Sequence, residues 1–162
     1  MSEIKKTNAM RLLDNAGINY ECKPYDFDEN DLDGHHVAEF LNIPYEEVFK
    51  TLVAVSDKGE YLVFCICVDD EIDLKKAAKL AGCKRVEMIK VKDLLSVTGY
   101  IRGGCSPIGM KKHYRTFFDE MIELVDNVSV SAGQRGLQVT LKPADLVKFT
   151  NAEVGDFAVR GQ

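Results

Sequence analysis

The sequence predicts a mixed α/β fold in which a curled, largely antiparallel β-sheet, or a barrel formed from it, is flanked by helices. Segments with a strand pattern outnumber those that a doubly wound parallel sheet requires, and they do not alternate regularly with helices. Two of them, 52–56 and 61–68, are joined by Asp57-Lys58-Gly59, a turn typical of antiparallel hairpins. No linker or internal repeat divides the 162 residues, which indicates a single domain, 1–162.

The first part of the chain mixes short helices with strands. Thr7 is a good N-cap and Gly17 a good stop, so we expect a helix at 7–16. A strand at 19–25 follows, and Pro24 places it at a sheet edge because proline cannot donate a hydrogen bond to a neighbouring strand. After an acidic loop at 28–34, the expected elements are a helix at 35–42 with Val37, Phe40 and Leu41 facing inward, a helical turn from Pro44 to Val48, and the two hairpin strands.

The second hairpin strand is apolar at nearly every position, so we expect both of its faces to be covered. Asp73 and Gly82 have the residue types that begin and end a helix, with Leu74, Ala77, Ala78 and Ala81 facing inward. The segment 98–112 is rich in glycine and has neither a helical nor a strand period. The remaining expected elements are a helix at 91–95, strands at 115–119, 127–131 and 137–141, a helix at 143–149 and a strand at 156–159.

Composition excludes several classes of protein. The longest apolar stretch, 61–68, is too short to span a bilayer and nothing resembles a signal peptide, so we expect a cytoplasmic protein with no membrane partner. Five irregularly spaced cysteines argue for reduced thiols, and the lack of a Cys-x-x-Cys motif argues against a zinc site or other metal. A net charge of −5 does not favour a protein that binds RNA or DNA unaided.

Three segments carry polar or glycine residues that packing does not explain. Lys50 is expected where a helix gives way to a strand; its ammonium there either holds a phosphate, polarises a carbonyl or simply reaches solvent. The glycine-rich loop 98–109 allows close backbone approach, and its N–H groups can bind an anion or an oxyanion. Ser131 and Gln138 flank a hairpin turn and are expected to face one another. Cys105 is the alternative nucleophile.

Taken together, these segments resemble the YbaK/EbsC family, whose bacterial members are Cys-tRNA(Pro) deacylases. The resemblance covers residues 6–147 and rests on several long motifs in the right order. The motifs are Thr7-Asn8-Ala9, Val48-Phe49-Lys50-Thr51-Leu52, Lys84-Arg85-Val86-Glu87-Met88, Thr98-Gly99-Tyr100-Ile101-Arg102-Gly103-Gly104, Ser106-Pro107-Ile108-Gly109-Met110-Lys111-Lys112, and Val130-Ser131-Ala132-Gly133 followed by Arg135-Gly136-Leu137.

The resemblance implies a single-domain fold in which a mixed sheet curls into a barrel with helices around it. That fold is related to the editing insertion of bacterial prolyl-tRNA synthetases. It also implies partners: the aminoacylated 3′ end of a tRNA, and a prolyl-tRNA synthetase that brings the mischarged tRNA. Delivery by a synthetase would allow an acidic protein to act on RNA. No cofactor and no DNA partner is implied.

The resemblance also implies roles for particular residues. The key lysine of the family falls on Lys50, and backbone N–H groups around Gly103 and Gly104 are expected to stabilise an oxyanion. Position 138 is a carboxylate in some members, whereas Gln138 offers no counter-charge to a substrate amine. Position 105 is aliphatic in relatives, which argues against Cys105 as a nucleophile. The expected substrate-binding residues are Tyr25, Thr51, Arg102, Ser106, Ser131, Gly133 and Gln138.

The implied activity is that of a trans-editing aminoacyl-tRNA deacylase, which removes cysteine from Cys-tRNA(Pro) and also from Cys-tRNA(Cys). The hypothesis is that the substrate thiol, which titrates near ~8.5 when free, attacks the neighbouring ester carbonyl and forms a cyclic thiolactone. Proline and alanine esters lack such a group and would escape. Two alternatives stay open: an Ala-tRNA(Pro) deacylase that uses water on the same fold, and a non-catalytic tRNA-binding or regulatory protein.

Overall fold

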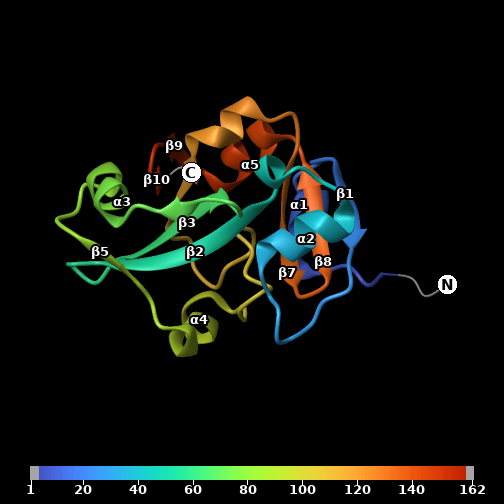
Figure 1. Cartoon of the computed structure of the whole chain (residues 1–162), viewed down its shortest axis with the longest axis horizontal. Helices are drawn as coiled ribbons and strands as arrows, with labels where there is room; N and C mark the ends of the chain where they lie inside the picture. The colour runs from blue at the N-terminus through green and yellow to red at the C-terminus, as the bar shows by residue number, and fades with distance from the viewer. Residues whose placement is uncertain (1–3, 160–162) are drawn as a thin grey trace.

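A five-stranded mixed sheet runs through the middle of the molecule in the computed structural model, which describes residues 4–159 (Figure 1). Its strands, in spatial order, are β5 (Val86–Met88), β2 (Phe49–Ser56), β3 (Tyr61–Cys67), β6 (Arg115–Asp119) and β9 (Glu153–Gly155). β2 pairs antiparallel with β3 and β5, whereas β6 pairs parallel with β3 and β9. Every residue of β3 after Tyr61 is buried, which confirms that both of its faces are covered.

A second, three-stranded antiparallel sheet packs against one face of the first. It contains β1 (Tyr20–Pro24), β8 (Leu137–Leu141) and β7 (Val128–Gln134) in that order, so the strand with Pro24 lies at the edge as predicted. The helices α1 (Asn8–Asn15) and α5 (Pro143–Thr150) contribute to the core between the two sheets. The largest hydrophobic cluster of the described residues fills this space, with members such as Leu13, Phe49, Phe118, Val130 and Leu146.

The opposite face of the five-stranded sheet is covered by α3 (Leu74–Ala81) and by a two-stranded ribbon of β4 (Glu71–Ile72) and β10 (Ala158–Val159). Phe64 and Phe117 stack there with ring centroids 5.0 Å apart, and Phe157 meets Phe64 edge to face. Asp73 caps α3 through the N–H groups of Lys75 and Lys76, and Gly82 ends it with a φ of 77°. Both helix signals are therefore confirmed.

Smaller elements complete the fold around the edge of the central sheet. The helix α2 (Gly34–Leu41) covers a third apolar cluster with Tyr25, Val48 and Val68 beneath it. The helix α4 (Val91–Thr98) lies beside the end of the glycine-rich segment, and it is longer than the predicted 91–95. Two 3₁₀ helices, η1 (Tyr45–Glu47) and η2 (Glu120–Leu124), join larger elements. No helix in the part 4–159 has the length and apolarity needed to cross a membrane.

Three expectations about the fold are corrected. The strands of residues 4–159 form three separate sheets rather than a closed barrel: β5 pairs only with the second half of β2, and an isolated bridge from Val48 to Ser129 is the one ladder contact between the start of β2 and β7. Phe40 is 48% exposed, because α2 turns Val37 and Ala38 toward the core instead. Leu74 is also 38% exposed at the first position of α3, where the helix has just left the ribbon.

Candidate active site

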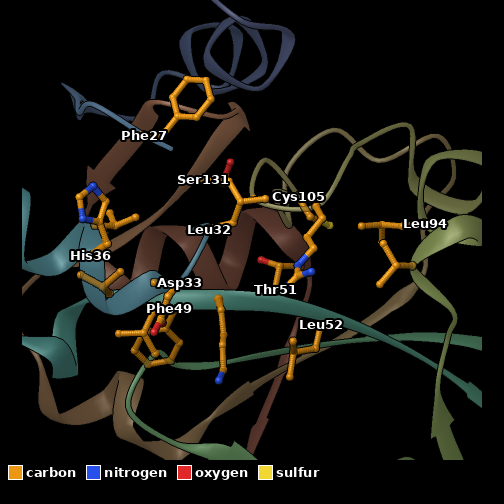
Figure 2. Close-up of a pocket in the computed structure, with 18 of the residues that line it drawn as sticks. Phe27, Leu32, Asp33, His36, Phe49, Thr51, Leu52, Leu94, Cys105 and Ser131 are labelled. Carbon is orange, nitrogen blue, oxygen red and sulfur yellow. The ribbon is translucent and has the colours of Figure 1, made fainter. Parts of the chain in front are cut away.

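A cavity of about 600 Å³ opens at the uncovered half of β2. Its walls come from β2, the loop before α2, α4, the glycine-rich segment and the β7–β8 hairpin (Figure 2). This volume is typical of small-ligand sites. Seven of the predicted site residues line it: Tyr25, Lys50, Thr51, Arg102, Gly103, Ser131 and Gln138.

The cavity reaches both faces of β2 because one edge of that strand is open. β5 pairs with β2 only from Ala54 to Ser56, and one further bond joins Ile89 N to Val53 O at 3.1 Å. Successive side chains of a strand alternate between its faces. Figure 2 accordingly shows Thr51 directed toward Ser131 and Cys105, with Leu52 on the other side of the strand.

Lys50 is the second residue of β2 and follows the 3₁₀ helix η1 by three positions, which confirms the predicted junction between a helix and a strand. It pairs with Ile66 in the register of the sheet, so its side chain leaves the face opposite to that of Thr51. Within residues 4–159 no carboxylate lies within 4.0 Å of its ammonium. The charge of Lys50 makes a minor contribution to the lowered pKa of Asp33, after the hydrogen bonds from His35. The half-buried ammonium is therefore available to an anion.

The two central glycines of the glycine-rich segment play different parts. Gly103 lines the cavity with a φ of 85°, a backbone conformation that favours glycine. Gly104 lies outside the cavity wall, and its N–H already donates to Ile101 O at 2.9 Å. A Cβ at Gly104 would stand 3.1 Å from Gln134 Cα, so the segment packs directly on the β7–β8 turn. Of the two expected oxyanion donors, only the Gly103 N–H remains a candidate.

An arginine fastens the glycine-rich segment to the β7–β8 turn. Arg135 Nε donates to the carbonyl oxygen of Arg102 at 2.8 Å. The Arg102 side chain is itself exposed at the rim of the cavity. Arg135 therefore holds the glycine-rich segment in place, whereas the Arg102 side chain is available to a ligand.

Two of the predicted substrate-binding residues, Ser106 and Gly133, do not line the cavity. Ser106 is wholly buried outside the cavity, where its Oγ accepts a hydrogen bond from Ile108 N at 3.2 Å. Gly133 has a φ of 103° and packs against the Tyr100 ring, which a Cβ would approach to 3.1 Å. Its N–H donates to Ser131 Oγ at 3.1 Å, so Gly133 acts on the cavity only by orienting that serine.

Ser131 and Gln138 do face one another, as the hairpin pattern predicted. They are directly opposed in the β7–β8 ladder, and both are more than nine-tenths buried. Behind them, Ser129 Oγ donates to Gln138 Oε1 at 2.9 Å. The polar end of the cavity, defined here as Thr51, Ser131 and Gln138, is thus assembled from two sheets.

The thiol in the cavity is not poised for nucleophilic attack. Burial raises the pKa of Cys105 to about 12, so its thiolate is scarce at neutral pH. The histidine of the cavity wall, His36, directs Nε2 at Asp26 O, 3.0 Å away. Within residues 4–159 no hydrogen bond joins a histidine to Cys105, Ser131 or Thr51. The geometry of an activated protein nucleophile is therefore missing from the described residues.

The sequence did not predict a group of ion pairs on the loop side of the cavity, which we call the His35 clasp. His35 lies between two carboxylates, with Nδ1 2.8 Å from Asp33 Oδ1 and Nε2 3.0 Å from Asp69 Oδ1. Both ring nitrogens face acceptors, which favours the cationic imidazole, and hydrogen bonds to Asp69 first and Asp33 second raise the pKa of His35. The pair Asp33–His35 is a visible N-cap signal, but Asp69 is too distant in sequence to be foreseen.

An apolar end of the cavity was also missed. It is defined by Leu52, Met88, Ile89, Val91 and Leu94, from β2, the segment around β5, and α4. Met88 and Val91 are partly exposed although they are apolar. Such a surface beside a polar end suits a ligand with one flat, weakly polar part and one reactive part.

Comparison with known proteins agrees with this architecture. The family model described as the aminoacyl-tRNA editing domain matches residues 33–149. A protein of Enterococcus faecalis, provisionally named Cys-tRNA(Pro)/Cys-tRNA(Cys) deacylase EbsC, is 42% identical over 156 residues, which cover 96% of this chain and 95% of that protein. The proline–tRNA ligase of Lactobacillus delbrueckii subsp. bulgaricus is 26% identical over 102 residues, or 63% of this chain and 18% of the ligase.

A solved structure shares the fold. It is a crystal structure provisionally identified as a trans-editing enzyme for prolyl tRNA synthetase, with a TM-score of 0.80 and 21% identity over 96% of this chain and 100% of the other. At that identity the likeness speaks for the fold alone. The family match spans the cavity walls from Asp33 through Gln138, and with the full-length relative it settles the assignment. The chain belongs to the aminoacyl-tRNA editing domain family.

Proposed function

We propose that this protein is a trans-editing aminoacyl-tRNA deacylase that removes cysteine from Cys-tRNA(Pro), and also from Cys-tRNA(Cys). The observation that carries the proposal is a cavity of about 600 Å³ with a polar end but no activated nucleophile among its described residues. A site of this kind suits a substrate that brings its own nucleophile. The name of the relative from Enterococcus faecalis supports cysteine as the amino acid.

The proposed reaction uses the thiol of the cysteinyl group. The sulfur attacks the ester carbonyl carbon, the bond from that carbon to the ribose oxygen breaks, and the thiol proton passes to the departing oxygen. The products are the free 3′ end of the tRNA and a cysteine thiolactone. The protein contributes orientation of the thiol against the carbonyl, and hydrogen-bond donors for the oxyanion as it forms.

The opposite directions of Lys50 and Thr51 suggest a division of the substrate along β2. Thr51, Ser131 and the Gly103 N–H adjoin the polar end, where the aminoacyl ester fits. Lys50 leaves the other face of the strand and has no carboxylate within 4.0 Å among the described residues, so it suits a phosphate of the terminal nucleotides. We assign the apolar end to the terminal adenosine, whose base is flat and weakly polar.

The same proposal includes a partner protein, a cellular location and the extent of the editing domain along the chain. A net charge of −5 makes unaided capture of tRNA unfavourable, so a prolyl-tRNA synthetase is proposed to deliver the mischarged tRNA. Deacylation would then take place in the cytoplasm, where the synthetase works. The editing domain is proposed to comprise residues 1–162, of which 1–3 and 160–162 lie outside the described part.

The test compares deacylation of Cys-tRNA(Pro) and Ala-tRNA(Pro) by the wild type, Lys50→Ala and Lys58→Ala. Lys58 is a matched control because it is an exposed lysine in the β2–β3 turn, away from the cavity. We expect selective loss of cysteine, and a fall in kcat/KM of about 10- to 100-fold for Lys50→Ala, the usual effect of losing a hydrogen bond to a charged group. Lys58→Ala should behave as the wild type.

Each other outcome points to a different function. Release of alanine instead of cysteine would support the Ala-tRNA(Pro) deacylase and remove the thiol mechanism. Rapid release of serine from Ser-tRNA would also contradict that mechanism, because an alcohol is a much poorer nucleophile. A wild type that cleaves none of these esters would leave the binding or regulatory protein.

A further inference from the structure

The amide of Gln138 has a fixed orientation because of a buried serine behind it. Ser129 is wholly buried, and its hydroxyl has no hydrogen-bond partner among residues 4–159 other than Gln138 Oε1, at 2.9 Å. If the amide were flipped, Nε2 would donate to Ser129 Oγ and the hydroxyl proton would lose Oε1, its acceptor in this structure. A buried donor without an acceptor costs about 1–3 kcal/mol. The buried serine therefore holds Oε1 away from the ligand.

The amide nitrogen of Gln138 is then the atom turned to the cavity. Gln138 lines the cavity, and no hydrogen bond occupies its Nε2 within the described part of the chain. Nor is Nε2 enclosed: among residues 4–159 the one buried side-chain nitrogen or oxygen without a partner is Thr140 Oγ1. Hence Nε2 retains accessible surface, and it presents N–H donors to whatever enters.

Ser131, directly across the ladder from Gln138, presents a donor as well. Its Oγ already accepts the Gly133 N–H at 3.1 Å, so its own hydroxyl proton remains for a ligand. Two adjacent donors repel the ammonium group of an aminoacyl ester and suit an oxygen acceptor. The carboxylates of the cavity, Asp31 and Asp33, belong to the opposite loop. The polar end therefore suits an oxygen of the aminoacyl ester, whereas the carboxylates on the loop side suit its amine.

We propose that Gln138 is a catalytic residue whose Nε2–H donates to the carbonyl oxygen of the aminoacyl ester and to the oxyanion that develops from it. This inference rests on the proposed deacylase function. It reverses the role expected from relatives with a carboxylate at this position, where an acceptor would meet the substrate amine. Gln138 thus supplies, together with the Gly103 N–H, the oxyanion donor that Gly104 does not.

Gln138→Glu is the sharpest test because it keeps the size and shape of the side chain and changes the group that faces the cavity. One carboxylate oxygen still accepts from Ser129 Oγ, while the other replaces the N–H donors with an anionic acceptor. We expect kcat for Cys-tRNA(Pro) to fall about 100-fold, the scale on which loss of one oxyanion donor is felt, with KM nearly unchanged. Protonation of the introduced carboxyl restores an O–H donor, so activity relative to the wild type should recover as the pH falls.

The outcomes separate this inference from the proposed function. Wild-type or higher activity of Gln138→Glu at neutral pH would overturn it, because a carboxylate there would then be serving the substrate amine. A loss that is the same at every pH would also overturn it, since that pattern indicates a structural role. A wild type that cleaves no ester counts against the deacylase proposal itself, whatever the variant does. Ser129→Ala, which frees the amide to flip, should cost less than Gln138→Glu.

Discussion

The two walls of the cavity are built in different ways. The fixed wall, defined as the β7–β8 hairpin with the glycine-rich segment 98–112, is held by backbone contacts, by the buried hydrogen bond Ser129–Gln138 and by the exposed hydrogen bond Arg135–Arg102. The loop wall, defined as residues 28–34, is mostly exposed and is held by the His35 clasp to Asp33 and Asp69. One wall holds its donors by packing against backbone, and the other depends on surface ion pairs.

This difference assigns separate tasks to the walls. Stabilising an oxyanion requires donors that are already in place, so the chemistry belongs on the fixed wall. Surface ion pairs contribute only about 0–1 kcal/mol each, so the His35 clasp adds little to the stability of the loop wall. Damage to the fixed wall should therefore impair catalysis, whereas damage to the loop wall should change local stability and its dependence on pH.

The largest effect is expected when the fixed wall is forced away from its support. Gly104→Ala would place a Cβ 3.1 Å from the backbone atoms Arg135 N and Gln134 Cα, which cannot move aside as a side chain would. A shift of about 1 Å in a positioned group costs about 100-fold in rate, and overpacking costs about 1–3 kcal/mol of stability. We expect losses of this size in kcat/KM and in the free energy of unfolding, measured by deacylation and by urea denaturation.

A second glycine serves as the control for that change. Gly59, in the β2–β3 turn, has a φ of 83°, and no atom outside its chain neighbours lies within 4 Å of the place where a Cβ would stand. Gly59→Ala therefore introduces backbone strain of about 1–2 kcal/mol without any clash near the cavity. If Gly59→Ala reduced kcat/KM as much as Gly104→Ala, general destabilisation would explain both losses. The claim that catalysis depends on the position of the fixed wall would then be wrong.

A smaller, pH-dependent effect is expected on the loop wall. The carboxylates raise the pKa of His35, so the clasp stabilises the fold fully below the unfolded pKa of about 6.5 and loses its effect as the pH rises through the raised value. Asp69→Asn should therefore lower the free energy of unfolding by less than about 1 kcal/mol near pH 6, and by less still near pH 9. Urea denaturation at the two pH values measures the difference; an equal loss at both would show that His35 is not the titrating group.

Local signals made much of the fold predictable. β6 and β8 have the bounds that the strand patterns indicated, and the caps Thr7 and Asp73 act as predicted, because each depends on a few neighbouring residues. The start of β2 was placed three residues late, since Lys50 and Thr51 interrupt the apolar pattern. That part of the strand exists because Phe49 and its neighbours pair with β3, a contact that single-sequence patterns do not reveal.

The candidate site shows the same difference between what the sequence indicates and what depends on contacts between distant residues. The resemblance brought together Ser131, Gln138 and Gly103, all of which line the cavity. It did not separate Gly103 from Gly104, because their difference lies in what the β7–β8 turn leaves room for. Nor did it reveal how the Gln138 amide is turned, because that depends on Ser129, nine residues away in sequence and one strand away in space.

The smallest effect is expected at the one thiol that lines the cavity within residues 4–159. Cys105 has a pKa raised to about 12 by its burial, so thiolate chemistry on the fixed wall is suppressed near neutral pH. Cys105→Ala should keep kcat/KM for Cys-tRNA(Pro) within about twofold of the wild type, because a small, partly buried thiol with a raised pKa contributes packing rather than reactivity. If Cys105→Ala lost as much kcat/KM as Gly104→Ala, Cys105 would have to be considered as the nucleophile, and attack by the substrate thiol would be contradicted. Conversely, unchanged deacylation by Cys105→Ala, together with cysteine-selective release, would leave the substrate's sulfur as the nucleophile and the fixed wall as the source of hydrogen-bond donors.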